Sequence, residues 1–162
     1  TSQPSLIAMM LRELSVRSGD NVLEIGSGSG YVCAILSNLC SEVVGVERIP
    51  ELLTASRNNI EKLGITNVSF HLAEKKIGLR QNKLFDVIIV SAALPRIPFD
   101  LLDQLTPLGR LVCPIGDLNG QSIIRLKKHL TGYTVKSVIG CRFVPFIGEA
   151  GWSQDEISNP TS

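Results

Sequence analysis

The sequence has almost no net charge. Lysine and arginine total 16 against 15 aspartates and glutamates, which leaves a formal charge of +1 in 162 residues. This balance supplies neither the basic surface that nucleic-acid binding requires nor the cluster of cations that attracts an anionic membrane. We therefore expect no nucleic-acid partner and no membrane partner.

Long apolar runs are also missing. No run reaches the roughly 18 residues that a membrane-spanning helix needs. The opening residues lack the charged start and apolar core of a secretory leader. We expect a cytoplasmic protein with one main domain, because a chain of this length can bury a single sizeable core.

Cysteine and histidine are sparse and scattered. The four cysteines contain no C-x-x-C pair, and both histidines lie far from them in the sequence. These residues are Cys33, Cys40, Cys113, Cys141, His71 and His129. Metal binding needs ligands that converge, so we expect no metal site. We expect instead buried free thiols, as in proteins of the reducing cytosol.

One stretch, NVLEIGSGSGY at 21–31, combines the features of a ligand-binding turn. Residues 22–25 form an apolar run, interrupted only by Glu24, that predicts a buried parallel strand. Three alternating glycines follow it, at Gly26, Gly28 and Gly30. A helix is predicted at 31–40. Glycines at such a turn let a ligand approach bare backbone, whose N–H groups can donate hydrogen bonds to it.

An acidic residue, Glu47, ends the next apolar run, VVGVE at 43–47. It lies about 20 residues beyond the first glycine, where a carboxylate accepts hydrogen bonds from ribose hydroxyls. The glycine spacing is G-x-G-x-G, with Tyr31 where the last glycine of the dinucleotide pattern G-x-G-x-x-G would stand. This shorter spacing favours S-adenosylmethionine over a nicotinamide cofactor. Glu24 beside the loop suits an ammonium group better than a phosphate.

Predicted strands and helices alternate through the first two-thirds of the chain, which indicates a parallel sheet. Helices are expected at 4–14, 31–40, 50–63 and 98–105, and strands at 22–25, 43–47, 67–72, 85–90, 110–115, 121–126 and 134–139. The expected fold class is α/β, with a doubly wound, mostly parallel sheet of the Rossmann-like class I methyltransferase type. Residues 1–152 are expected to form this methyltransferase domain and 153–162 a polar, frayed tail.

Ligands of such sheets bind outside the carboxyl ends of the strands. We therefore expect the glycine loop, Glu47, 73–75 and 91–95 to converge. Methyltransferases that act on the amino groups of bases commonly carry Asp/Asn-Pro-Pro-Tyr after the fourth strand, but this chain has SAALP at 91–95. Its small side chains favour a nucleophile that needs room.

Several motifs of the chain are similar to those of one family. They are TSQP at 1–4, VLEIGSGSGY at 22–31, ERIPE at 47–51, AALPRIP at 92–98, GRLVCPIG at 109–116 and RFVPF at 142–146. With these motifs in order up to about Trp152, the chain resembles protein-L-isoaspartate O-methyltransferase. The resemblance implies methyl transfer from S-adenosylmethionine to the α-carboxylate of L-isoaspartyl residues, a repair activity on damaged proteins. Isoaspartyl-containing peptides or proteins would be its partners.

The resemblance also implies roles for individual residues. Ser2 looks like the serine whose hydroxyl lies near the substrate carboxylate, and it is the catalytic candidate. The residues expected to bind the cofactor are Glu24, Gly26, Ser27, Gly28, Gly30, Glu47, Arg48 and Glu74. The residues expected to bind the substrate are Ser2, Ala92, Val144 and Pro145.

Two departures from the family pattern concern the cofactor and the substrate. The family has Gly-Asp-Gly after the third strand, where the aspartate binds the adenine amino group, but this chain has AEK at 73–75. Glu74 can accept the same hydrogen bond, while the side chain of Lys75 can crowd the purine. Family members also carry a longer segment before the serine motif. Its absence here implies an excised domain, a partner that covers the site, or impaired turnover.

The implied chemistry needs no general base, because a carboxylic acid with a pKa of about 4 is already ionised at pH 7. Ser2 would orient the carboxylate, a role compatible with capping the first helix. Two alternatives stay open. One is a non-catalytic S-adenosylmethionine-binding module, which the altered loop at 73–75 favours. The other is a methyltransferase that acts on a different carboxylate.

Overall fold

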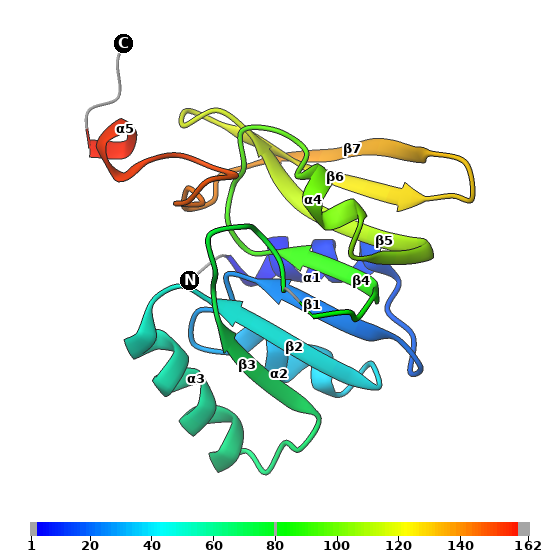
Figure 1. Ribbon diagram of the computed structural model, residues 1–162, viewed down its shortest axis with the longest axis vertical. Helices are drawn as coiled ribbons and strands as arrows, with labels where there is room; N and C mark the ends of the chain where they lie inside the picture. The colour runs from blue at the N-terminus through cyan, green and yellow to red at the C-terminus, as the bar shows by residue number, and fades with distance from the viewer. Residues whose placement is uncertain (1–2, 80, 159–162) are drawn as a thin grey trace.

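A seven-stranded sheet runs through the computed structural model, which describes residues 3–79 and 81–158 (Figure 1). The strands lie in the order β3-β2-β1-β4-β5-β6-β7. Their bounds are β1 (Asn21–Ile25), β2 (Glu42–Glu47), β3 (Val68–Leu72), β4 (Phe85–Val90), β5 (Leu105–Gly116), β6 (Gln121–Lys128) and β7 (Tyr133–Cys141). The helices are α1 (Pro4–Leu14), α2 (Tyr31–Ser37), α3 (Pro50–Lys62), α4 (Phe99–Leu102) and α5 (Gln154–Ser158).

Strands β1 to β5 pair in parallel, whereas β6 and β7 are added antiparallel beyond β5. The short connections at 117–120 and 129–132 explain this change, because only antiparallel strands can be joined by a hairpin. The predicted α/β class with a mostly parallel sheet is confirmed. Among the described residues, no helix is both long enough and apolar enough to span a membrane.

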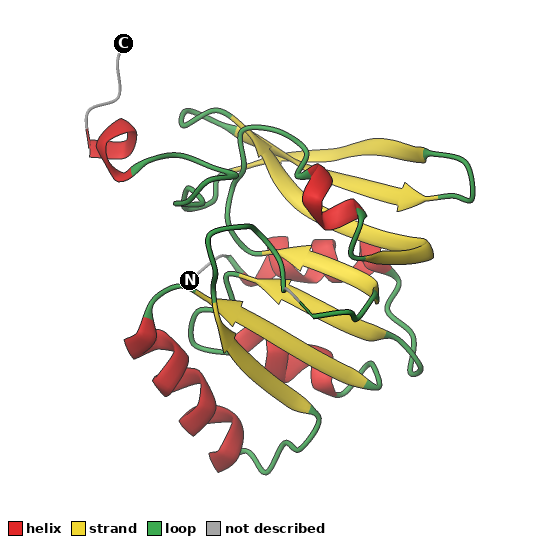
Figure 2. Ribbon diagram, in the orientation of Figure 1, coloured by secondary structure: helices red, strands yellow, loops and turns green. Residues whose placement is uncertain are grey.

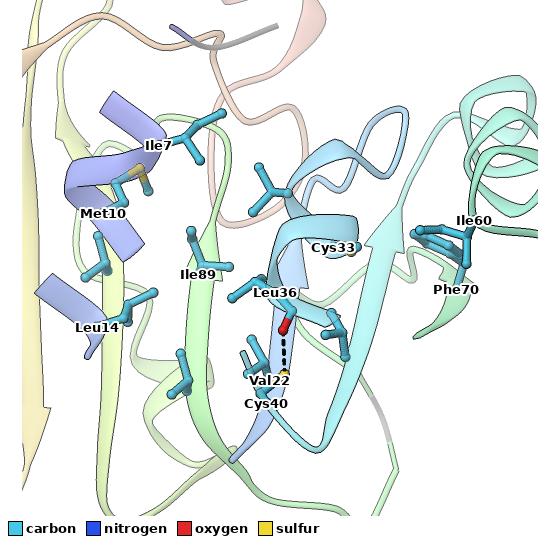
Figure 3. Close-up of a cluster of buried hydrophobic side chains, with 14 of the residues drawn as sticks. Ile7, Met10, Leu14, Val22, Cys33, Leu36, Cys40, Ile60, Phe70 and Ile89 are labelled. Atoms are coloured by element: carbon cyan, nitrogen blue, oxygen red, sulfur yellow. Dashed lines mark hydrogen bonds between the residues drawn. The ribbon is translucent and has the colours of Figure 1, made fainter. Parts of the chain in front are cut away.

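Apolar side chains form a core on each face of the sheet. Helices α1, α2 and α3 cover one face and α4 with the loop after β3 covers the other (Figure 2). Figure 3 shows the first core, with Met10 and Leu14 of α1 on one side and Ile60 of α3 against Phe70 on the other. The sheet is therefore covered on both faces, by three helices on one and by one short helix and a loop on the other.

The cysteines are free thiols, as predicted. Cys33, Cys40 and Cys113 are buried, and Cys141 is half-buried. The Cys40 thiol donates a hydrogen bond to the Leu36 carbonyl, with Sγ and O 3.1 Å apart (Figure 3). Burial raises the pKa of all four thiols, that of Cys40 to about 11.

Strand β5 begins earlier than the sequence predicts. The prediction placed its start at Arg110, because a proline and a glycine within 106–109 favour a turn. The structure starts the strand at Leu105. Phe85 of β4 pairs with Leu105, whereas Val87 pairs with Arg110, so residues 106–109 bulge out between these pairs. The residues predicted to form a turn, 106–109, thus form a bulge within strand β5.

The polar tail is not frayed throughout, contrary to the prediction, because residues 154–158 form the short helix α5. A capping box starts this helix. The Ser153 backbone N–H donates to Glu156 Oε2 at 2.7 Å, and the Glu156 N–H donates to Ser153 Oγ at 3.2 Å. Hydrogen bonds from Ser153, its backbone N–H first, lower the pKa of the exposed Glu156 carboxyl. The S-x-x-E pattern at 153–156 was the sequence signal for this helix.

Gly45 in β2 has no room for a side chain, because the ring of Phe70 on the neighbouring strand β3 lies over it. A Cβ built on Gly45 would lie 2.6 Å from Phe70 Cδ1 and 3.0 Å from Ser27 Cβ. We expect Gly45→Ala to lower the free energy of unfolding by about 1–3 kcal/mol through overpacking. Urea unfolding measures this loss. Gly19→Ala is the control, because a Cβ at Gly19 meets nothing within 4 Å; equal stability of the two variants would contradict the prediction.

Candidate active site

A cleft of about 1170 Å³ opens at the carboxyl ends of the parallel strands. Figure 1 shows the arrowheads of β1, β2 and β4 pointing towards the side where α1 begins. The walls come from the start of α1, the glycine loop, and residues 46–49, 73–78, 91–92 and 140–148. The predicted convergence is confirmed, except that only the first two residues of 91–95 line the cleft.

The glycine loop joins β1 to α2 with a backbone that glycine adopts readily. Gly26, Gly28 and Gly30 have φ values of 78°, 53° and 84°, all in the left-handed region. A Cβ on Gly28 would meet nothing within 4 Å, so this glycine faces open space at the cleft. Gly30 does not line the cleft. It is the N-cap residue of α2, where a Cβ would crowd Phe70 and Ser56 at 3.2 Å.

Glu47 binds the glycine loop at the end of β2. Its Oε2 accepts a hydrogen bond from the Gly28 N–H at 2.9 Å. Its Oε1 accepts from the N–H groups of Arg48 at 2.8 Å and Ile49 at 3.0 Å. A carboxylate has about four acceptor positions, so Glu47 can hold the loop and still accept a hydrogen bond from a ligand in the cleft. Its role towards ribose stays a prediction.

Glu24 is almost fully buried, at 1% exposure, yet it belongs to the wall of the cleft. Its Oε1 accepts from the Ser91 hydroxyl at 2.7 Å, and its Oε2 accepts from the Cys33 thiol at 2.9 Å. Burial raises the pKa of the Glu24 carboxyl to about 7, although both hydrogen bonds oppose the rise. An ammonium group placed here would favour the ionised carboxylate.

Sequence reasoning missed Cys33 and Ser91 as partners of Glu24. A carboxyl in the middle of a buried strand needs donors, which was a signal that such partners exist. Ile25 of β1 pairs with Val90 of β4, so the residue after β4 arrives beside the glycine loop. Ser91 could be placed beside Glu24 only once β4 was known to pair with β1, and the sequence does not give this strand order.

Ser27 holds a hydroxyl oxygen that is buried without a hydrogen-bond partner among the described residues. Such a group usually finds a partner in a folded protein, and a polar ligand in the cleft is one. The cleft also exceeds the roughly 300–1000 Å³ of a typical small-molecule site, so it has room for a cofactor and part of a substrate. Together with the glycine loop, these features fit S-adenosylmethionine.

The remaining cofactor candidates, Arg48 and Glu74, are exposed and line the cleft. Lys75 lies beside them, and Ala73 is tied to the end of β2 by its N–H, which donates to the Glu47 carbonyl at 2.9 Å. No group of three or more His, Cys, Asp or Glu side chains in the described ranges could hold a metal ion.

The opposite wall is the segment 142–146, which is hydrogen-bonded to the loop after β4 and to β6. The Ala93 N–H donates to the Val144 carbonyl, and the Phe146 N–H donates to the Ala93 carbonyl, both at 2.8 Å. The buried Gln121 side chain accepts from the Phe143 N–H at 2.9 Å. Sequence reasoning missed Gln121, because nothing in its neighbourhood along the chain distinguishes it.

Three of the four substrate candidates fall on this side of the cleft. Ala92, Val144 and Pro145 all line it. Ser2, the catalytic candidate, lies outside the described residues. The next residue, Gln3, is the N-cap residue of α1 and lines the cleft.

Comparison with known proteins gives one consistent family. The model of the protein-L-isoaspartate(D-aspartate) O-methyltransferase family matches residues 1–151. The chain is 42% identical over 152 residues to the protein-L-isoaspartate O-methyltransferase of Trichlorobacter lovleyi, covering 93% of this chain and 70% of the relative. It is 44% identical over 154 residues to that of Desulfosudis oleivorans, covering 95% and 70%.

Two solved structures agree with these matches. A protein-L-isoaspartate O-methyltransferase superposes with a TM-score of 0.84 at 31% identity, covering 93% of this chain and 49% of its own. A candidate enzyme of the same kind from Plasmodium falciparum, in complex with S-adenosyl-L-homocysteine, gives 0.70 at 27% identity, covering 89% and 74%. This chain therefore spans about half of the first structure. It belongs to the protein-L-isoaspartate O-methyltransferase family, whose cofactor is S-adenosylmethionine.

Proposed function

We propose that this chain transfers the methyl group of S-adenosylmethionine to the free α-carboxylate of L-isoaspartyl residues in damaged proteins. The observation that carries the proposal is one cleft with two unlike walls. One wall is the glycine loop with Glu24 and Glu47, and the other is the tethered segment 142–146. A methyl donor and an acceptor need to meet between such walls.

The cofactor residues divide by the chemistry they can offer. Glu24 pairs with the ammonium group, and Glu47 accepts from the ribose hydroxyls. Gly26, Gly28 and Ser27 let the methionine part lie against the loop. The outer candidates are Gly30, which shapes the loop through α2, and Arg48 and Glu74 at the nucleoside end.

The transfer itself requires orientation more than activation. S-adenosylmethionine supplies an electrophilic methyl group. A carboxylate oxygen of the substrate forms the new bond to that methyl carbon while the carbon–sulfur bond breaks, which leaves a methyl ester and S-adenosylhomocysteine. Alignment of two bound groups can contribute roughly 7–11 kcal/mol to catalysis. Ala92 leaves room for the carboxylate, the backbone at Val144 and Pro145 holds the peptide, and Ser2 orients the acceptor oxygen.

The test is methyl transfer to a peptide that contains L-isoaspartate, with the matched L-aspartyl peptide as control. We expect transfer to the isoaspartyl peptide alone, measured with radiolabelled S-adenosylmethionine. Calorimetric titration with S-adenosylmethionine accompanies the assay. Cofactor binding without transfer would instead support a non-catalytic binding module, the alternative that Ala73, Glu74 and Lys75 favour by departing from the family loop.

Ser2→Ala tests the orienting role. Loss of one hydrogen bond to the carboxylate is expected to lower kcat by about 2- to 10-fold and to leave the Kd for S-adenosylmethionine unchanged. Ser5→Ala is the matched control, because Ser5 is an exposed residue of α1. A large loss of cofactor affinity in Ser2→Ala would contradict the role.

The proposal extends to the setting of the enzyme. The relatives are longer than this chain, which supports a further segment, domain or partner that covers the cleft. The free thiols support a cytoplasmic location. The formal charge of +1 supports the expectation of no nucleic-acid partner and no membrane partner.

A further inference from the structure

We propose that the guanidinium of Arg142 binds the substrate carboxylate that receives the methyl group. The inference rests on the proposed function and deepens it, because it adds a substrate-binding residue to the site. Arg142 is exposed and lines the cleft. Its guanidinium makes no hydrogen bond or ion pair with any other residue of 3–79 or 81–158.

The charges around the cleft explain why a cation is needed at this place. The wall already holds the carboxyl groups of Glu24, Glu47 and Glu74. A substrate carboxylate brought into the same cleft is repelled by those that are ionised, unless a cation lies near it. In the reactive complex the sulfonium of S-adenosylmethionine offsets part of this repulsion, and a protein cation on the substrate side would offset the rest.

The cations of the cleft are not spread evenly. Arg48 follows β2, and Lys75 and Lys76 follow β3, so these three belong to the nucleoside end. Arg142 follows β7 and adjoins the segment that is hydrogen-bonded to Ala93, next to the proposed acceptor site. Among the described residues that line the cleft, Arg142 is thus the cation on the substrate side.

The backbone that carries Arg142 is fixed from two directions. Gln121 on β6 accepts from the N–H of Phe143, the residue after Arg142. Gln121 Nε2 in turn donates to the Asp117 carbonyl at 2.5 Å, so the amide itself is oriented. One residue further on, Val144 is bound by Ala93. A fixed backbone with an unpaired side chain is what a ligand-binding arginine requires.

Arginine suits this task chemically. Its planar guanidinium donates two parallel hydrogen bonds to a carboxylate and so fixes the plane of the acceptor as well as its position. Each carboxylate oxygen keeps a lone pair for attack on the methyl group. The interaction exists before the reaction, so its loss is expected to raise KM for the peptide more than it lowers kcat.

The experiment is a thermodynamic cycle, in which the Arg142 side chain and the carboxylate of the peptide are changed separately and together. Wild type and Arg142→Gln are titrated, in the presence of S-adenosylhomocysteine, with an isoaspartyl peptide and with the isoasparaginyl peptide, which has a neutral amide in place of the carboxylate. We expect Arg142→Gln to weaken isoaspartyl binding by about 10- to 100-fold and isoasparaginyl binding by less than about twofold. Equal losses for the two peptides, or no loss for either, would overturn the inference.

Three controls separate this role from other causes. Arg142→Lys keeps the positive charge but not the two parallel N–H donors of the guanidinium, and it is expected to give an intermediate affinity for the isoaspartyl peptide. Arg96→Gln removes an exposed arginine outside the large cleft and is expected to leave both affinities unchanged; a loss equal to that of Arg142→Gln would show a general charge effect and overturn the inference. Affinity for S-adenosylmethionine should be the same in all variants. Absence of methyl transfer by the wild type would refute the proposed function itself, whereas transfer with no coupling in the cycle refutes only Arg142.

Discussion

Replacing Glu24 with glutamine is expected to weaken S-adenosylmethionine binding by about 10- to 100-fold and, above pH 7, to stabilise the protein without ligand. The first effect follows because the variant loses a charged acceptor for the ammonium group. The second follows because a buried carboxylate without a cation is costly, and glutamine removes it. Opposite effects on binding and stability are typical of a residue kept for function.

The pH dependence gives the sign of the stability effect. Burial raises the pKa of the Glu24 carboxyl from 4.5 to about 7. Between these values the folded protein holds a proton that the unfolded chain has released. The free energy of unfolding therefore falls as the pH rises through this window, by about 3 kcal/mol in total, and stays lower above pH 7. Glutamine does not titrate, so Glu24→Gln lacks this fall.

Binding should carry the same signature. In the wild type, Glu24 loses its proton to pair with the ammonium group, so affinity for S-adenosylmethionine should rise between pH 6 and pH 8. Calorimetry at these values and urea unfolding from pH 4.5 to 8 measure both effects. Glu61→Gln, on an exposed position of α3, is the control. A variant that binds within threefold of wild type, or whose stability difference does not depend on pH, would contradict the role.

Arg110→Leu is expected to lower the free energy of unfolding by about 3–5 kcal/mol, because it leaves a mostly buried carboxylate without its cation. Arg110 forms an ion pair with Asp20, and the two side chains are only 13% and 10% exposed. Arg110 Nε also donates to the Leu14 carbonyl at 2.8 Å, and Nη2 to the Ser15 carbonyl at 3.1 Å. The same guanidinium thus binds the end of α1 to the sheet.

The double variant Arg110→Leu/Asp20→Asn separates the two contributions. Asparagine leaves no charge to desolvate, so the double variant should regain part of the stability that Arg110→Leu loses. The double variant should not regain the stability that came from the hydrogen bonds between Arg110 and the end of α1. Thermal unfolding should show a drop of about 6–20 °C for the single variant. A loss below about 1 kcal/mol in urea unfolding, or no recovery in the double variant, would contradict this account.

The parts of the fold that depend on local pattern were predictable. The apolar run that includes Glu24, the three glycines and the acidic end at Glu47 identified β1, the loop and β2, because each signal lies within a few residues. The start of α1 was also predictable, since Pro4 fits the first turn of a helix. The glycine spacing already indicated the cofactor, and the family motifs added the expected substrate class.

Features that depend on distant partners were not predictable. The pairing of Glu24 with Ser91 spans 67 residues, and the hydrogen bond from Arg110 to Leu14 spans 96. The role of Gln121 depends on β6, which brings its side chain within hydrogen-bond distance of the Phe143 N–H. The bulge at 106–109 depends on how β4 and β5 pair, and sequence periodicity does not report that register.

The contact between Arg110 and the end of α1 also has a consequence for biosynthesis. Helix α1 leaves the ribosome well before its docking surface on β5 and β6 is made. Until then its apolar residues Ile7, Met10 and Leu14 lack the part of their core that β5 and β6 supply. The mouth of the cleft, to which α1 contributes, is therefore completed only after β5 and β6 have been synthesised.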